Sequence, residues 1–211
     1  MIFYDCTTAP SPRRVRMFIQ EKKINIKTKN VDLRNSEQLE DWFSAINPRN
    51  TVPVLVSKEN NILFHSLSIC VYLEEEFPDI NLLGRTNEEK GQILNLINDI
   101  ESNLFLAIAD CLRNTSKAMK NRAITGPKNF EQIPELAIRG RERVKSYFDI
   151  LNQQLNGKSF LCSDRFTAAD IWAFVAVDFT RAIKEPIPNF MIGLKDWYEQ
   201  IAKRDSAQLK L

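Results

Sequence analysis

Apolar positions in the first part of the chain switch between short runs and a helical repeat. Residues 1–6, MIFYDC, form an apolar run of strand length. Within residues 11–23, Val15, Phe18 and Ile19 stand three and four positions apart, so they share one face of a helix. This pattern predicts a strand followed by a helix.

The same alternation of periods continues to residue 77. Residues 24–33 alternate between apolar and polar, as in a half-buried strand. Ser36 is a good N-cap for a helix over residues 36–46. The pattern then predicts a strand, a hairpin turn, a strand and a helix, at 51–57, 58–61, 61–66 and 66–77. The resulting order β-α-β-α-β-β-α is typical of a small α/β domain with a mixed sheet.

From residue 88 onward the pattern is helical. Helices are expected over about 88–120 and 134–156, and from about 167 and 188, with a loop at 121–133. We therefore expect an α/β domain over residues 1–79, a linker over 80–87 and an all-helical domain over 88–211.

Composition and charge exclude several classes of function. The chain has 211 residues, of which 44% are hydrophobic and 27% charged, as in ordinary soluble proteins. A net charge of +2 is too small to indicate nucleic acid or a membrane surface as the partner. No membrane-spanning run or signal peptide is evident. A single histidine, His65, and no GxGxxG or P-loop leave no basis for a histidine triad, a multi-histidine metal site or a phosphate loop.

The cysteines point to a reducing compartment. Cys6, Cys70, Cys111 and Cys162 lie far apart, with no CxxC pair. Neither a disulfide framework nor a zinc site is expected from such spacing. We therefore expect a cytoplasmic protein with no bound metal.

Three motifs in order carry a resemblance to a known family. They are NPRNTVPVL (47–55), FHSLSICVYLEEEFP (64–78) and FTAADIWAF (166–174). Together they resemble the cytosolic glutathione S-transferase family over the whole chain. The resemblance implies a thioredoxin-like N-terminal domain followed by an all-α domain. It also implies a homodimer in which the thiolate of the co-substrate glutathione attacks a small electrophile, in conjugation or in reduction of peroxides or disulfides, as in detoxification.

The expected glutathione site begins at Val52 and Pro53. An X–Pro bond can be cis, which would turn the N–H and C=O of Val52 outward, where a peptide can pair as an added strand. The resemblance implies that the cysteinyl backbone of glutathione binds there. It places the glycyl carboxylate near Thr51, where relatives often have Lys or Gln.

The γ-glutamyl end is expected at the start of the next helix. Ser66 there offers a hydroxyl and free amides to a carboxylate. In the family an acid before this serine binds the ammonium of glutathione. Here His65 replaces that acid, and a neutral imidazole can accept a hydrogen bond but supplies no opposing charge. The other interpretation of these residues is a simple N-cap with an exposed neighbour.

The sulfur is expected at the start of the first helix. Alignment of RRVRMF with the family's N-terminal motifs (bacterial nu-like, theta-like and zeta-like) puts Ala9 where relatives have Cys or Ser. Ser11 is then the first choice of hydroxyl donor to the thiolate, and Thr8 is the alternative. The favoured interpretation of Arg13, Arg14 and Arg16 is solvated surface charge; the alternative is added positive potential at the sulfur.

Two further sets of residues have expected roles. The resemblance puts the second-substrate pocket around Asn103, Ala107, Asp110 and Cys111, although a core position is the simpler interpretation of that face. Thr167 and Asp170 stand three apart and predict a capping box, which is a folding device.

Two functions from different classes remain. One is a glutathione-dependent enzyme, supported by Val52, Pro53 and Ser66. The other is a non-catalytic protein-interaction module of the same fold, as in relatives of the stringent-starvation or translation-factor type. The substitutions at Ala9, Thr51 and His65 support the second, which is kept as the alternative, while the enzyme is the predicted function.

Overall fold

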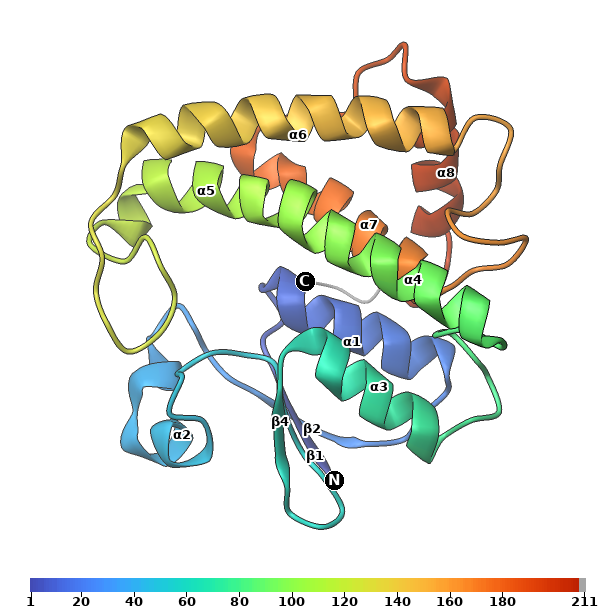
Figure 1. The fold of residues 1–211 in the computed structure, drawn as a ribbon. Helices are drawn as coiled ribbons and strands as arrows, with labels where there is room; N and C mark the ends of the chain where they lie inside the picture. The colour runs from blue at the N-terminus through green and yellow to red at the C-terminus, as the bar shows by residue number, and fades with distance from the viewer. Residues whose placement is uncertain (209–211) are drawn as a thin grey trace. The chain divides into compact units, whose positions relative to one another are not determined.

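The computed structural model describes residues 1–208 and divides the chain into two compact units (Figure 1). The first comprises Met1–Asn81 together with Thr125–Asn129, which is the tip of the long loop before residue 134. The second comprises Leu82–Ile124 and Phe130–Gln208. The bounds expected above for the domains and their linker stay a prediction.

A four-stranded mixed sheet with helices builds the first unit. The strand order is β2-β1-β3-β4, in which β1 pairs parallel with β2 and antiparallel with β3, and β3 pairs antiparallel with β4. The expected β-α-β-α-β-β-α order is confirmed. The elements are β1 (Ile2–Asp5), α1 (Pro10–Glu21), β2 (Lys27–Asn30), the short 3-10 turn η1 (Glu37–Leu39), α2 (Asp41–Ile46), β3 (Val54–Val56), β4 (Ile62–Phe64) and α3 (Ser66–Glu76).

Helices α1 and α3 lie side by side (Figure 1). The ammonium of Lys22 at the end of α1 makes a buried ion pair of 2.6 Å with Glu74 of α3, and it also donates to the carbonyl of Ile80. A buried pair of this kind fixes geometry more than it adds stability. It therefore sets how the two helices, whose N-termini both belong to the expected site, are placed.

Two sequence expectations in this unit are wrong. Ser36 caps no helix over 36–46: its φ is +61°, its side chain caps nothing, and α2 begins only at Asp41. The strand expected over 24–33 is paired only from Lys27 to Asn30, and all four of these residues are exposed. Edge strands need no apolar face, so the alternation came from flanking residues such as Ile24 and Val31, which are buried outside the strand.

The second unit is all-helical, as expected. Within the described residues its elements are α4 (Asn87–Asp99), the π-helical turn η2 (Ile100–Phe105), α5 (Leu106–Thr115), the 3-10 turn η3 (Lys117–Met119), α6 (Pro134–Gln154), α7 (Ala168–Phe179), the 3-10 turn η4 (Thr180–Ile183) and α8 (Ile192–Ala202). Helix α7 is the centre of this unit because every residue from 168 to 178 is buried.

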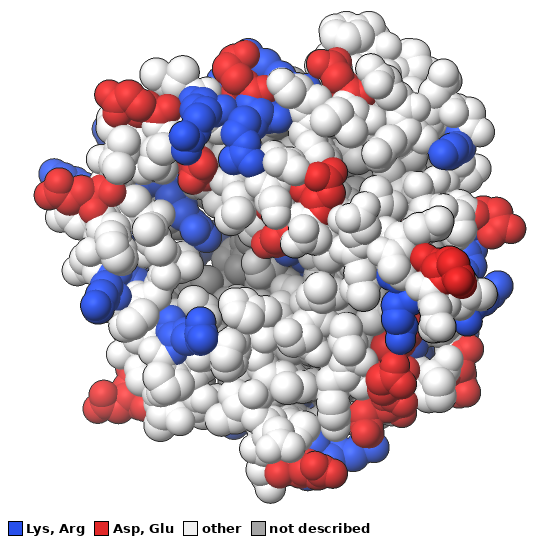
Figure 2. Space-filling view, in the orientation of Figure 1, with Lys and Arg blue, Asp and Glu red and all other residues white. Residues whose placement is uncertain are grey.

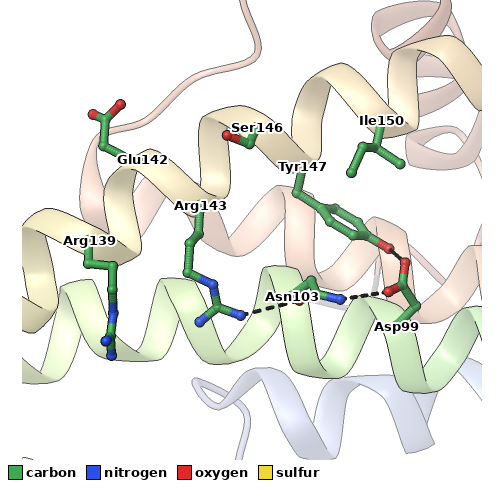
Figure 3. Close-up of a pocket in the computed structure, with 8 residues that line it drawn as sticks. All are labelled: Asp99, Asn103, Arg139, Glu142, Arg143, Ser146, Tyr147 and Ile150. Atoms are coloured by element: carbon green, nitrogen blue, oxygen red, sulfur yellow. Dashed lines mark hydrogen bonds between the residues drawn. The ribbon is translucent and has the colours of Figure 1, made fainter.

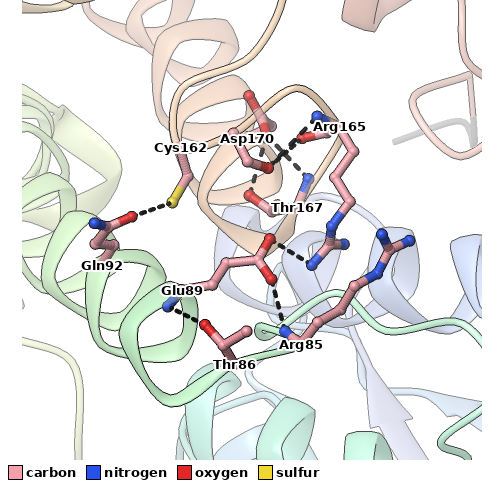
Figure 4. A network of polar contacts seen from close by, with 9 residues as sticks. Arg85, Thr86, Glu89, Gln92, Cys162, Arg165, Thr167 and Asp170 are labelled. Carbon is pink, nitrogen blue, oxygen red and sulfur yellow. Dashed lines mark hydrogen bonds and ion pairs between the residues drawn. The ribbon is translucent and has the colours of Figure 1, made fainter.

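The predicted cap of α7 is present (Figure 4). The carboxylate of Asp170 accepts from the N–H of Thr167 at 3.0 Å and from its hydroxyl at 3.2 Å. The same buried carboxylate accepts from the N–H of Leu161 and the indole N–H of Trp197. These donors keep a buried acid hydrogen-bonded, although burial still raises its pKa.

Candidate functional site

The N-terminus of α1, where the sulfur is expected, has few free donors. Ala9 is the N-cap and supplies no side-chain hydrogen bond. Pro10 and Pro12 carry no N–H, and the N–H of Arg13 donates to the carbonyl of Ala9 at 3.3 Å. Within residues 1–208, only Ser11 keeps an unpaired N–H in this first turn. Prolines occupy two of the first three helical positions, so this helix start offers one free amide.

Arg16 braces the loop between β1 and α1. Its guanidinium makes a 2.6 Å ion pair with Asp5 and donates to the carbonyls of Cys6 at 3.0 Å and Thr7 at 3.3 Å. Thr8 follows on this loop, exposed, with its hydroxyl 3.4 Å from the sulfur of Cys6. One side chain therefore holds the loop that leads into the expected sulfur site.

In the sequence, the only sign of this role is Asp5, an acid at the end of an apolar strand. The favoured interpretation of the three arginines as solvated charge is wrong. Arg13 and Arg14 are buried, with exposed fractions of 6% and 2%, and Arg16 is bound to the loop. The burial of Arg13 and Arg14 includes nitrogen atoms of their guanidinium groups, so these two charges are not solvated.

The strand edge at Val52 has the features expected for peptide binding. The Val52–Pro53 bond is cis, as predicted. Val52 is half-buried, and neither its N–H nor its C=O has a hydrogen-bond partner among residues 1–208. Regular pairing of β3 starts two residues later, at Val54. A free donor and acceptor on one residue form the pairing unit of an added antiparallel strand.

Thr51 is held in place by hydrogen bonds from the buried side chain of Asn47. The amide of Asn47 donates to the carbonyl of Thr51 at 2.8 Å and to its hydroxyl oxygen at 3.3 Å. Asn47 also accepts from the N–H of Arg49, which closes the turn before the strand edge. The hydroxyl of Thr51 is thus an acceptor within the turn and retains its proton for an incoming oxygen.

The N-terminus of α3 has more unpaired N–H groups than that of α1. His65 is the N-cap of α3, exposed, with φ of +72° and its ring against Phe64 at 5.1 Å. The N–H of Ile69 donates to the carbonyl of His65, while those of Ser66, Leu67 and Ser68 are unpaired among the described residues. Three free amides at a helix start form an anion site. The free amides expected at the start of this helix are therefore present, at Ser66, Leu67 and Ser68.

The hydroxyl of Ser66 is directed at α1. It donates to the carbonyl of Ser11 at 2.8 Å, and Ser66 is buried. The structure thus brings together the residue predicted for the γ-glutamyl end of the ligand and the residue predicted for its sulfur. The sequence contained no sign of this contact, because the two serines are 55 positions apart.

The face expected to hold a second substrate packs against α6 instead. Cys111 is buried, its thiol donates to the carbonyl of Ala137 at 3.2 Å, and burial raises its pKa. A Cβ on Gly140 would lie 2.6 Å from the carbonyl of Ala107. Ala107 and Cys111 are therefore core residues, which agrees with the simpler interpretation of this face.

Asn103 lines a groove between η2 and α6 (Figure 3). Its amide donates to Asp99, which also accepts from the phenol of Tyr147 at 2.7 Å. Arg143 donates to the carbonyl of Ser102 at 2.6 Å. Burial and the nearby Asp99 raise the pKa of Tyr147, so it stays a neutral donor in this network.

Among the described residues, neither a charged surface patch nor a cluster of metal-binding side chains indicates a second functional site. Basic and acidic side chains are interspersed on the face in Figure 2. Over residues 1–208, no three His, Cys, Asp or Glu side chains are grouped to hold a metal ion, and the four cysteines are unbonded thiols. No helix among the described residues is both long and apolar enough to span a membrane.

Comparison with known families decides what this arrangement belongs to. Residues 8–76 match the profile of the glutathione S-transferase N-terminal domain, and residues 111–205 match that of the C-terminal domain. The chain belongs to the glutathione S-transferase family. The matched regions include the predicted residues Thr8, Ser11, Thr51, His65 and Ser66, and a glutathione S-transferase-like function follows from the membership.

Relatives of this glutathione S-transferase family member span its whole length. Glutathione S-transferase 2 of Saccharomyces cerevisiae is 25% identical over 99% of this chain and 88% of its own. A solved glutathione S-transferase domain-containing protein from Marinobacter aquaeolei has 28% identity and a TM-score of 0.90, covering 99% and 100% of the two chains. A Sulfitobacter glutathione transferase homolog solved with bound glutathione has the same fold, at 17% identity, a TM-score of 0.80 and coverage of 98% and 94%.

These findings confirm the predicted family, the α/β-then-α fold and the assignment as a glutathione transferase-type enzyme. The closeness to nu-like, theta-like and zeta-like members stays a prediction. The roles of individual site residues also stay predictions, and they are taken up below.

Proposed function

We propose that the chain binds glutathione as a co-substrate along the strand edge at Val52 and presents its thiolate to a small electrophile. The observation that carries this is the free N–H and C=O of Val52, beside Pro53. The cysteinyl unit of glutathione has a complementary acceptor and donor, so it can pair there as a short antiparallel strand. Residues 1–79 are the glutathione-binding domain in this proposal, with 80–87 as linker and 88–211 as the helical domain.

The two ends of the tripeptide then have different partners. The γ-glutamyl carboxylate lies at the three free amides that start α3 at Ser66. The ammonium of the γ-glutamyl residue faces the imidazole of His65, which can accept a hydrogen bond from it but supplies no negative charge. The glycyl carboxylate lies toward Thr51, whose hydroxyl proton is available.

The sulfur is placed at the start of α1. A free thiol with a pKa of about 8.5 is only a few per cent ionised at neutral pH. The hydroxyl of Ser11, its unpaired N–H and the positive end of the helix dipole each favour the thiolate. Thr8 is the alternative hydroxyl on the loop braced by Arg16. Such a site lowers the barrier by supplying more thiolate, not by covalent catalysis from the protein.

In the proposed reaction, the thiolate of bound glutathione attacks an electrophile that lies next to it. Its sulfur lone pair forms a bond to an electrophilic carbon, and the leaving group departs with its electron pair. With a peroxide, an S–O bond forms while the O–O bond breaks and hydroxide or alkoxide leaves. With a disulfide, a new S–S bond forms while the old one breaks and a thiolate leaves. We also propose a homodimer in the cytoplasm, with a role in detoxification. Four unbonded thiols fit a reducing compartment.

Calorimetry with reduced glutathione, followed by conjugation of an aryl halide, tests the proposal. Ser11→Ala should lower kcat/KM at neutral pH by about tenfold, equal to one pKa unit of lost thiolate. Thr28→Ala, which removes an exposed hydroxyl on the edge strand β2, is the matched control and should leave the rate unchanged.

Three outcomes would count against the proposal. If millimolar glutathione does not bind, the non-catalytic interaction module becomes the better account. If glutathione binds but Ser11→Ala retains the full rate while Thr8→Ala loses it, the thiolate donor is Thr8. If both variants retain the full rate, neither hydroxyl serves the sulfur.

A further inference from the structure

We propose that Arg49 binds the glycyl carboxylate of glutathione and makes the site selective for thiol peptides that end in a free carboxylate. This inference rests on the proposed function and deepens it, because it names the charged group that fixes one end of the ligand. Arg49 is exposed and lies in the turn between α2 and β3, two positions before Thr51.

The pairing proposed at Val52 fixes the direction of the ligand. In an antiparallel pair, the next residue of one strand lies opposite the preceding residue of the other. With the cysteinyl unit opposite Val52, the glycyl unit lies opposite Thr51, and the γ-glutamyl unit extends the other way, past Pro53. Each strand residue advances by about 3.4 Å. The terminal carboxylate follows the glycyl unit, so it reaches the turn that contains Arg49.

The guanidinium of Arg49 lies over the ring of Phe64, with its Cζ 4.6 Å from the ring centroid. Phe64 is the last residue of β4 and pairs with Val54, so the charged end of Arg49 lies beside the start of β3. A guanidinium stacked on a ring still has its N–H groups directed outward in one plane, and this fork matches the two oxygens of a carboxylate. The stack therefore holds a cation near the ligand end and leaves its donors available.

The charge of Arg49 is available and its backbone is held. Within residues 1–208, no acidic side chain forms an ion pair with Arg49. Its N–H donates to the side chain of Asn47 at 3.1 Å. Its carbonyl oxygen lies 3.7 Å from the position of a Cβ built on Gly126, in the loop tip that belongs to the same compact unit. A held backbone limits where the guanidinium can reach, as a selective binding group requires.

The test compares glutathione with its glycinamide analogue, in which a neutral amide replaces the glycyl carboxylate, and measures Kd by calorimetry. The unsubstituted protein should bind glutathione about ten times more tightly, because the amide cannot form the charge-assisted hydrogen bonds. Arg49→Gln should bind the two ligands equally within about twofold, through weaker binding of glutathione. Arg49→Lys should keep part of the preference, since it retains the charge without the planar fork.

Lys58→Gln is the matched control, because it also removes one positive charge from the first unit. Lys58 is exposed, ion-paired with Glu76 and 5.7 Å from the ring centroid of Phe77. It lies in the hairpin that follows β3, at the far end of this strand from Val52. The tenfold preference for glutathione should therefore persist in this variant.

The inference is overturned if the unsubstituted protein binds both ligands equally, or if Arg49→Gln keeps the full preference. It is also overturned if the preference is lost in Lys128→Gln, which removes an exposed cation two positions from Gly126, and persists in Arg49→Gln. Glutathione still binds in each of these cases, so the proposed function is retained. Failure of the unsubstituted protein to bind glutathione overturns the proposed function, and this inference with it.

Discussion

At the scale of single residues, the site uses neighbours that the family pattern does not name. Ala9 leaves the start of α1 without a capping group, and Arg16 organises the preceding loop through three acceptors. Ser66 and Ser11 are joined by one hydrogen bond. Each of these groups contributes a single hydrogen bond or ion pair, so its effect on a bound ligand depends on how accurately the group is positioned.

His65 offers a direct test of the γ-glutamyl end at this scale. His65→Glu would place a negative charge beside the expected ammonium, and charge-assisted hydrogen bonds contribute about 1.5–3 kcal/mol. We expect glutathione to bind roughly ten times more tightly to the variant, or better, by calorimetry.

The control for this variant is a glutathione analogue that lacks the α-amino group. Its binding should gain nothing from His65→Glu, because it has no ammonium to pair. Equal gains for both ligands would show that the ammonium does not lie at residue 65.

At the scale of elements, helices are held by their ends and by close crossings. Thr86 caps α4 by accepting from the N–H of Glu89, and Thr167 with Asp170 caps α7. Helices α5 and α6 approach so closely at Gly140 that a side chain there would meet backbone. These contacts fix where two helices of this unit begin and how closely two others cross.

The α5–α6 crossing should not tolerate a methyl group. Gly140→Ala puts a Cβ 2.6 Å from the carbonyl of Ala107 and 2.9 Å from the sulfur of Cys111, so the helices must separate. We expect a loss of about 1–3 kcal/mol in urea unfolding. Gly91→Ala in α4, where nothing lies within 4 Å, should instead gain up to about 1 kcal/mol. Equal effects of the two changes would contradict this account of the crossing.

Glu89 links the start of α4 to the loop before α7, and its contribution should depend on pH (Figure 4). Burial acts to raise its pKa, but hydrogen bonds from Arg85 and Arg165 and the Arg165 charge outweigh this, so the pKa lies below its ordinary 4.5. A carboxyl with a lowered folded pKa stabilises the fold fully above its unfolded value and loses that contribution as pH falls through the folded pKa.

Urea unfolding of Glu89→Gln at several pH values measures this effect. The difference in unfolding free energy from the unsubstituted protein should be largest near neutral pH and shrink below about pH 4.5. A difference that is constant from neutral to acid pH would show that the charge of Glu89 contributes nothing.

At the scale of the whole molecule, ligand binding and folding are linked. A ligand that binds only the folded chain stabilises it by about 2.7 kcal/mol at one hundred times its Kd. We expect glutathione to raise the thermal unfolding midpoint accordingly. An analogue with methyl in place of the thiol should act almost equally, because the backbone and the carboxylates carry most of the binding. Stabilisation by glutathione alone would place the main affinity at the sulfur.

The fold class, the order of elements and the cap of α7 could be predicted from the sequence, because they follow from the hydrophobic period and from short motifs with fixed spacing. The cis bond before Pro53 was expected from proline chemistry together with the family resemblance. The positions at which a tripeptide thiol binds were implied by the resemblance and stay predictions. The sequence pattern misplaced the start of α2 and the burial of β2, where a turn with positive φ and an edge position overrode propensity.

The connections among the candidate site residues arise from the packed fold and cannot be read from the sequence. The bond from Ser66 to Ser11, the contacts of Arg16 with the β1–α1 loop and the packing of Cys111 against α6 join residues that are 9 to 55 positions apart. The proton of a serine and the face of a helix are assigned by what lies opposite them. No local pattern carries that information, because it arises only when the sheet and the helices have packed.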